Sequence, residues 1–201
     1  LPILPFRVEM VIDAPRDYQV VIANSHIRAA KSSAAKHTFN ARIAAYNLGL
    51  TLLRQRCPEV ADMLQYVRDI DPATLGCTTA DVYRFLLRIP ERMTRRDFTA
   101  MLSREQRESI DANFATHADP KHYHPRGVLL YGAAETVRSR LCVDHLESGQ
   151  IGRLGQLMKI SHDGDRVSRP GADGKYHATP PHCSDDYLHG LIHDLAGEDP
   201  D

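Results

Sequence analysis

Residues 22–42, IANSHIRAAKSSAAKHTFNAR, join an apolar segment to a long predicted helix. The apolar segment reads YQVVIA, which predicts a buried strand, and it ends at Asn24 and Ser25. The helix is predicted to begin near Thr38, because threonine is a favourable N-cap and apolar residues follow at near-helical spacing. This stretch therefore predicts a strand, a polar loop and a helix in direct succession.

The connecting loop is basic. It carries Arg28, Lys31, Lys36 and His37, with no acidic residue among them. A strand edge, a basic loop and a helix N-terminus together could form an anion site. The alternative is a solvated connector whose charges have no specific role, and composition alone does not decide between the two.

This stretch resembles the galactokinase branch of the GHMP sugar kinases, which includes galactokinase and N-acetylgalactosamine kinase. That branch has a strand ending in I-A-N-S, a loop with a lysine, and the motif [YF]-N-x-R at the opening of a helix. Residues 22–25, Lys31 and residues 39–42 fit these three features in order.

A second stretch, residues 127–162, resembles another part of the same family. It reads GVLLYGAAETVRSRLCVDHLESGQIGRLGQLMKISH and matches a long helix with a glutamate, here Glu135, followed by a break and the signature G-x-L-M-x-x-S-H. The signature is fitted by Gly155, Leu157, Met158, Ser161 and His162. Together the two matches extend from residue 22 to residue 162 of the 201 residues.

The resemblance implies an ATP-dependent sugar-1-kinase, which transfers the γ-phosphoryl group of ATP to the anomeric hydroxyl of a hexose with ATP and Mg²⁺ as cofactors. The sequence contains no GxGxxG, no GxxxxGK[ST] and no glycine- and serine-rich phosphate loop. Phosphoryl transfer needs such a phosphate cradle. We therefore expect a C-terminal fragment of the kinase that has no catalytic residue of its own and is inactive alone.

The fold implied by the resemblance is α+β and mostly helical, a truncated GHMP kinase C-terminal domain that is ferredoxin-like with added helices. Residues 1–25 are predicted to form a β-hairpin, a small antiparallel element that continues from a missing N-terminal kinase domain. Residues 26–201 form the helical domain, with a surface insertion at 163–184 in which Asp173 and Gly174 suggest a hairpin turn.

Capping signals and apolar spacing predict the other helices. Pro58 starts one that buries Val60, Met63, Leu64 and Val67. The others are expected after Thr78 or Thr79, over 97–102, after Ser103, over 126–147, over 152–161 and over 185–195.

The resemblance also assigns candidate roles. Phe39 and Asn40 would contact the sugar, while Arg28, Lys31 and Arg42 would lie near the transferred phosphate. The alternatives are that Phe39 is the first core residue of its helix and that Arg42 is an exposed helix cation. Phenylalanine can stack on a hexose but cannot donate a hydrogen bond, which leaves the identity of the sugar open.

Four further residues are predicted to support this site. Asn24 and Ser25 would order the loop. Glu135 would accept a hydrogen bond from the basic loop, or would simply pair with Arg138 or Ser139 on its own helix. His162 would be structural, at a helix end where a charged imidazole interacts favourably with the dipole.

Composition limits the other classes of function. The net charge of −1 disfavours nucleic-acid binding, and no apolar run is long enough to span a membrane. The four cysteines are scattered, which is typical of reduced thiols in a cytoplasmic protein. We expect a monomer without a metal site, because the pair His189 and His193 lacks an accompanying HExxH motif. The alternative function is a non-catalytic helical module for sugar sensing or protein interaction.

Overall fold

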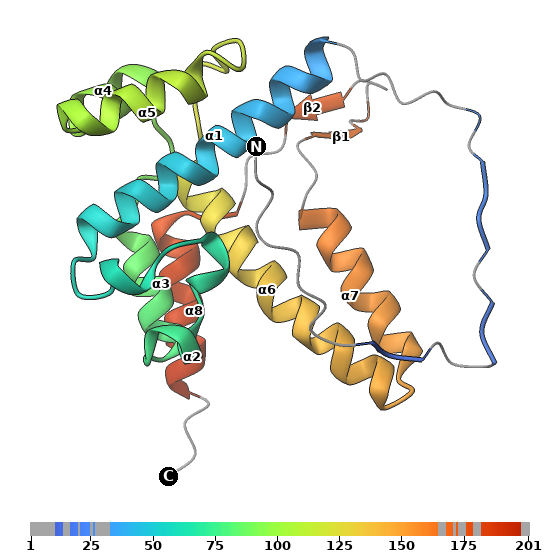
Figure 1. The fold of residues 1–201 in the computed structure, drawn as a ribbon. Coiled ribbons are helices and arrows are strands. Elements are labelled where there is room, and N and C mark those ends of the chain that lie inside the picture. Colours follow the sequence, from blue (N-terminus) through green and yellow to red (C-terminus); the bar gives the residue numbers. More distant parts are fainter. Residues whose placement is uncertain are drawn as a thin grey trace.

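The computed structural model describes residues 11–13, 17–19, 21–24, 26, 33–164, 168–170, 172, 176–178 and 182–197. Within these residues the chain is helical, apart from two strands of three residues each (Figure 1).

Two long helices form the centre of the molecule. Helix α1 spans Ser33–Arg56 and packs against helix α6, which spans Pro125–Glu147. The helices approach closely at Gly49, where an added Cβ would lie 3.0 Å from Cγ of Leu129. The α1 residues buried in this core are small or aliphatic: Ala44, Ala45, Leu48, Leu50, Leu52 and Leu53.

The beginning of α1 is not part of the core. Phe39 is 65% exposed and Ile43 is 44% exposed, so the alternative that Phe39 is the first core residue of its helix is wrong. The helix also begins at Ser33 rather than near Thr38. The apolar spacing did not reveal that the alanines face α6 and that Phe39 is left uncovered.

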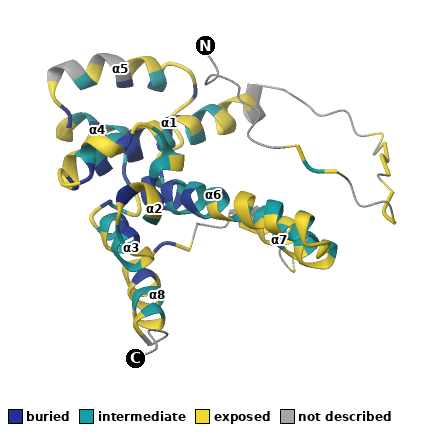
Figure 2. Ribbon diagram, turned by 60° about the horizontal axis from the view of Figure 1, so that its bottom comes forward, coloured by how far each residue is buried: buried dark blue, intermediate teal, exposed yellow. Residues whose placement is uncertain are grey.

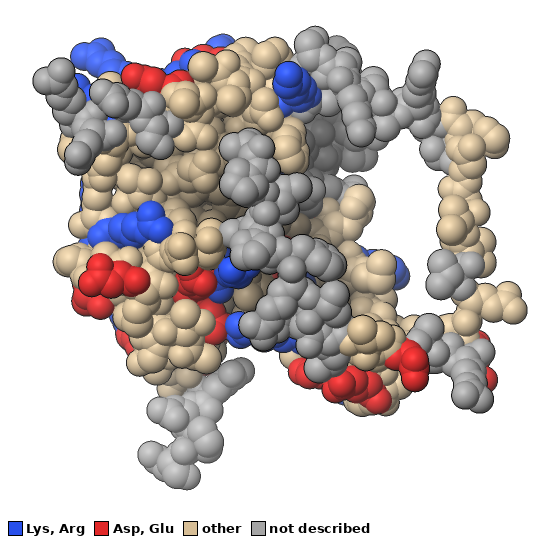
Figure 3. All heavy atoms as spheres, in the orientation of Figure 1, with Lys and Arg blue, Asp and Glu red and all other residues tan. Residues whose placement is uncertain are grey.

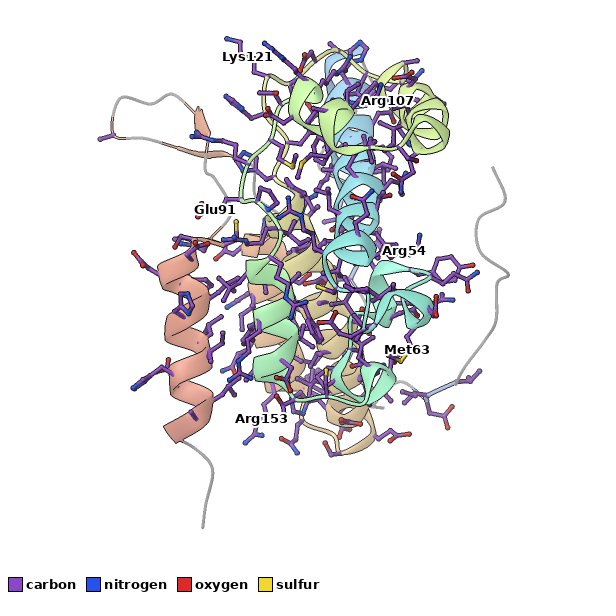
Figure 4. The ribbon with its side chains drawn as sticks, turned by 90° about the vertical axis from the view of Figure 1, so that its left-hand side faces the viewer. Arg54, Met63, Glu91, Arg107, Lys121 and Arg153 are labelled. Atoms are coloured by element: carbon purple, nitrogen blue, oxygen red, sulfur yellow. The ribbon has the colours of Figure 1, made fainter. Side chains whose placement is uncertain are left out.

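The segment after α1 folds into short turns. Two 3-10 turns, η1 (Ala61–Met63) and η2 (Val67–Asp69), stand where a helix from Pro58 was predicted. Nε of Arg54 holds this segment by donating to the carbonyl of Leu64 at 2.5 Å, and Figure 4 shows Arg54 on α1 beside the turn that carries Met63.

Two helices follow. Helix α2 spans Pro72–Leu75 and helix α3 spans Thr79–Leu87. The side chains of Thr78 and Asp81 form a capping box at the start of α3, which confirms the predicted cap.

Helices α4 (Arg95–Met101) and α5 (Arg104–Phe114) follow, and α5 packs against α1; this segment is here called the α4–α5 unit. The predicted capping box at the start of α5 is confirmed, with Ser103 and Gln106 bonded reciprocally. Met93 and Tyr123 exchange two backbone hydrogen bonds where the chain enters and leaves the unit.

The last two helices pack on different partners. Helix α7 (Ile151–Gly164) lies along α6, and helix α8 (Asp185–Gly197) lies along α3 (Figure 1). Buried residues concentrate where α1, α3 and the first half of α6 meet, whereas α7 has none (Figure 2).

The prediction of a ferredoxin-like α+β fold is wrong. Residues 11–13, 17–19 and 21–24 form no strand, and Val21 and Ile22 are exposed. The described residues contain one strand pair, β1 (Ser168–Pro170) antiparallel to β2 (Tyr176–Ala178), and it lies in the insertion rather than at the N-terminal end. An apolar run predicts a strand only if another element covers it, and among the described residues none covers Val21 and Ile22.

Candidate functional site

The beginning of α1 presents three of the predicted site residues in three directions. Nδ2 of Asn40 donates to the carbonyl of Thr116 at 2.8 Å, so Asn40 faces the end of the α4–α5 unit. Arg42 lies two residues further, about 200° around the helix, and faces α6. Phe39 lies between these two directions and is exposed.

Arg42 joins α1 to the α6–α7 pair through an aromatic ring. Its guanidinium carbon lies 5.1 Å from the centroid of the Tyr131 ring, within the range of a cation–π interaction. Arg138 approaches the same ring at 5.8 Å. The hydroxyl of Tyr131 donates to the carbonyl of Ser161 at 3.3 Å, which links the ring to α7.

Glu135 is held by one partner on its own helix and one on α7. Its Oε1 accepts from Nε of Arg138 at 2.6 Å, and the two side chains also form an ion pair. Its Oε2 accepts from Oγ of Ser161 at 2.7 Å. The predicted pairing with Arg138 is confirmed, and the bond from Ser161 ties the glutamate of one motif to the serine of the G-x-L-M-x-x-S-H signature.

A cavity of about 540 Å³ opens between α6 and α7 beside these contacts. Its walls combine aromatic, apolar and charged side chains, including Tyr131, Glu135, Arg138, Met158, Ser161 and His162. We call this cavity the α6–α7 groove. It is a surface groove with mixed walls, and its glutamate and arginine form an ion pair.

His162 lies at the rim of this groove and is exposed. Asn24 orders its own loop, since its Oδ1 accepts from the backbone N–H of His26 at 2.8 Å. Arg28, Lys31 and Ser25 lie outside the described residues, so their predicted roles stay predictions. The structure thus brings Arg42, Glu135 and His162 to one region and directs Asn40 away from it.

The described residues form no metal site in this region. No group of three or more histidine, cysteine, aspartate or glutamate side chains among the described residues is arranged to hold a metal ion. Burial raises the pKa of the Cys183 thiol to about 11, which keeps it protonated and disfavours it as a metal ligand.

Basic and acidic side chains are interspersed on the face shown in Figure 3.

Sequence reasoning missed Tyr131, although it lies four residues before Glu135 and therefore on the same face of the helix. That spacing was visible in the sequence, but only the fold shows that Arg42 of another helix reaches the ring.

Comparisons with family models, curated proteins and solved structures find no match to this chain. Among the described residues, no helix has the length and apolar character needed to cross a membrane.

Proposed function

We propose that this chain is the helical C-terminal part of a sugar-1-kinase of galactokinase type. The kinase would transfer the γ-phosphoryl group of ATP, with Mg²⁺, to the anomeric hydroxyl of a hexose in the cytoplasm. The phosphate cradle and the catalytic aspartate would come from another part of the natural gene product, because this sequence has no phosphate-binding loop.

One observation carries the proposal. The two stretches that resemble the kinase family are far apart in the sequence, yet they are joined by a chain of contacts in the structure. Arg42 of the first stretch lies over Tyr131, whose hydroxyl donates to Ser161, and Ser161 in turn donates to Glu135. The two stretches therefore lie side by side on α1, α6 and α7, as the proposal requires.

The exposed Phe39 ring is the candidate sugar contact. An aromatic ring that lies uncovered at the start of a helix loses apolar hydration when a hexose face stacks on it. Arg42 lies three residues further along α1 and faces Tyr131 of α6. We assign it the phosphate-proximal role, in which a cation offsets charge on the transferred group.

The test is sugar-dependent thermal stabilisation of the natural gene product that contains these residues. We expect galactose, N-acetylgalactosamine, fucose or arabinose to raise its melting temperature. Phe39→Ala should weaken the sugar affinity about tenfold or more, since a buried phenylalanine contributes about 1.5–3 kcal/mol. Tyr187→Ala, which removes an exposed aromatic ring from α8, is the matched control.

The outcomes separate the two functions considered from the sequence. Sugar binding with sugar-dependent ATP turnover supports the kinase. Sugar binding without turnover supports a sugar-sensing module, and no stabilisation by any of the four sugars contradicts the proposal.

A further inference from the structure

Residues 116–118, at the exit of the α4–α5 unit, are bonded to the start of α1 at two points. The carbonyl of Thr116 accepts from Nδ2 of Asn40, and the backbone N–H of Ala118 donates to Nδ1 of His37 at 3.1 Å. The second bond needs an unprotonated Nδ1, because an imidazole nitrogen that carries a proton cannot accept.

His117, between these two residues, is buried, and both of its ring nitrogens are engaged. Oγ1 of Thr116 uses its proton to donate to the carbonyl of Asn113 at 2.7 Å, so it can only accept from Nδ1 of His117, 3.0 Å away. His117 is thereby fixed as the tautomer that carries its proton on Nδ1.

The other nitrogen, Nε2, lies 2.7 Å from the hydroxyl of Tyr123. Nε of Arg95 donates to that same hydroxyl at 3.0 Å. Since the arginine can only donate, the Tyr123 proton is free to point at Nε2 of His117, which accepts it. Every donor and acceptor in this buried series of hydrogen bonds, from Arg95 through Tyr123 to His117, is therefore satisfied when the imidazole of His117 is neutral.

A proton on Nε2 would disrupt this arrangement. The Tyr123 oxygen would then face two N–H donors, and its own proton would lose its acceptor inside the core formed by Phe98 and Phe114. A positive imidazolium would also lie beside the Arg95 guanidinium, whose Nη2 already donates to the His117 carbonyl.

We propose that residues 116–118 are an acid-sensitive latch that holds the α4–α5 unit against the start of α1, and that protonation of His117 releases it. The charged and titratable groups that face His117 are Arg95 from α4, His37 from α1, and Asp119 and Tyr123 from the connecting loop. Asp119 is the one group among them whose charge opposes release.

The pKa of His117 is shifted in the direction that release by acid requires. Burial, followed by the charge of Arg95, lowers the pKa of His117 below its ordinary value of 6.5. The unfolded or opened state therefore binds protons more readily than the closed state. Closure is stable above pH 6.5 and is progressively lost as the pH falls from 6.5 through the lowered pKa.

The experiment is hydrogen exchange, followed peptide by peptide at about pH 7.5 and about pH 5.5 and corrected for the intrinsic exchange rate. We expect exchange in the α4–α5 unit and at the start of α1 to accelerate by up to about tenfold at the lower pH, with α3 and α8 unchanged. His117→Gln keeps an acceptor for Tyr123 but does not titrate, so the acceleration should be much reduced. His193→Gln, at a histidine whose side chain is 90% exposed, should behave like the wild type.

Equal acceleration in His117→Gln and the wild type would overturn the latch, as would no acceleration in the wild type. If the variant does not fold, the imidazole nitrogen spectrum of the wild type decides. A proton on Nδ1 alone at neutral pH supports the latch, and a proton on Nε2 overturns it. Neither measurement needs ATP or a sugar, so the latch can fail without affecting the proposed kinase function.

Discussion

Arg126 and Asp185 join the start of α6 to the start of α8 by a bond of 2.6 Å between Nη1 and Oδ1. The arginine side chain is only 4% exposed. Its other donors reach three backbone carbonyls, those of Leu87, Ile89 and Cys183. Glu91 approaches Nη1 at 3.6 Å and lies near the beginning of α8 in Figure 4. A single buried guanidinium therefore ties together the end of α3, the start of α6 and the start of α8.

We predict that Arg126→Met lowers the free energy of unfolding by about 3–5 kcal/mol, because two buried carbonyls and one partly buried carbonyl lose a donor that was also charged. Chemical denaturation measures the loss. Arg153→Met, at an exposed arginine of α7, is the control and should cost less than about 0.5 kcal/mol. A similar cost for the two variants would show that Arg126 does not hold the helices together.

Asp71 should make the protein sensitive to strong acid. Burial raises the pKa of Asp71, but the hydrogen bonds and charge of Arg140, with bonds from Thr74, outweigh burial and lower it below the ordinary 3.8. The carboxylate therefore stabilises the fold above pH 3.8, and that contribution is lost as the pH falls from 3.8 through the lowered pKa.

The matching variant is Asp71→Asn. It should destabilise the protein by about 1.5–3 kcal/mol at neutral pH, and the difference from the wild type should shrink as the pH falls below 3.8. Urea unfolding across this pH range measures both effects. A difference that does not change with pH would contradict the assigned ion pair with Arg140.

Gly132 should tolerate a side chain poorly. A Cβ there would lie 2.5 Å from Cγ1 of Val67 and 3.1 Å from the Tyr46 ring. Gly132→Ala should therefore cost about 1–3 kcal/mol, whereas Gly190→Ala, within α8 and open to solvent, should gain up to about 1 kcal/mol. Thermal unfolding of the two variants gives the comparison, and shifts of the same sign would contradict the close packing at Gly132.

Ser161 should control how firmly α7 is held. Ser161→Ala removes the only described α7 side chain that donates to Glu135, so α7 should exchange its amide hydrogens several times faster, at a cost of about 1–2 kcal/mol. Ser139→Ala is the control, because the Ser139 hydroxyl bonds to the Thr136 carbonyl within its own helix. Equal exchange of α7 in the two variants would show that this bond does not hold the helix.

Local features of the fold could be predicted from the sequence. The caps at Thr78 and Ser103 were predictable because each capping box is formed by residues three apart. The pairing of Glu135 with Arg138 has the same spacing. These interactions lie within one turn of helix and do not depend on the rest of the fold.

Features that depend on distant partners could not be predicted. The run that contains Val21 and Ile22 looked like a buried strand, but burial depends on a covering element that the run does not specify. Arg126 was overlooked because arginines are rarely buried, and its carbonyl partners come from segments far along the chain. The contact of Arg42 with Tyr131 likewise exists only because α1 packs on α6.

The most direct test of the kinase proposal is phosphorus NMR of the natural gene product incubated with ATP, Mg²⁺ and each of the four sugars in turn. The proposal predicts that ADP forms only when a sugar is present and that a sugar 1-phosphate appears in equal amount, while the 201-residue chain alone produces neither. Absence of sugar-dependent ATP consumption with all four sugars, or phosphate on a hydroxyl other than the anomeric one, would contradict it.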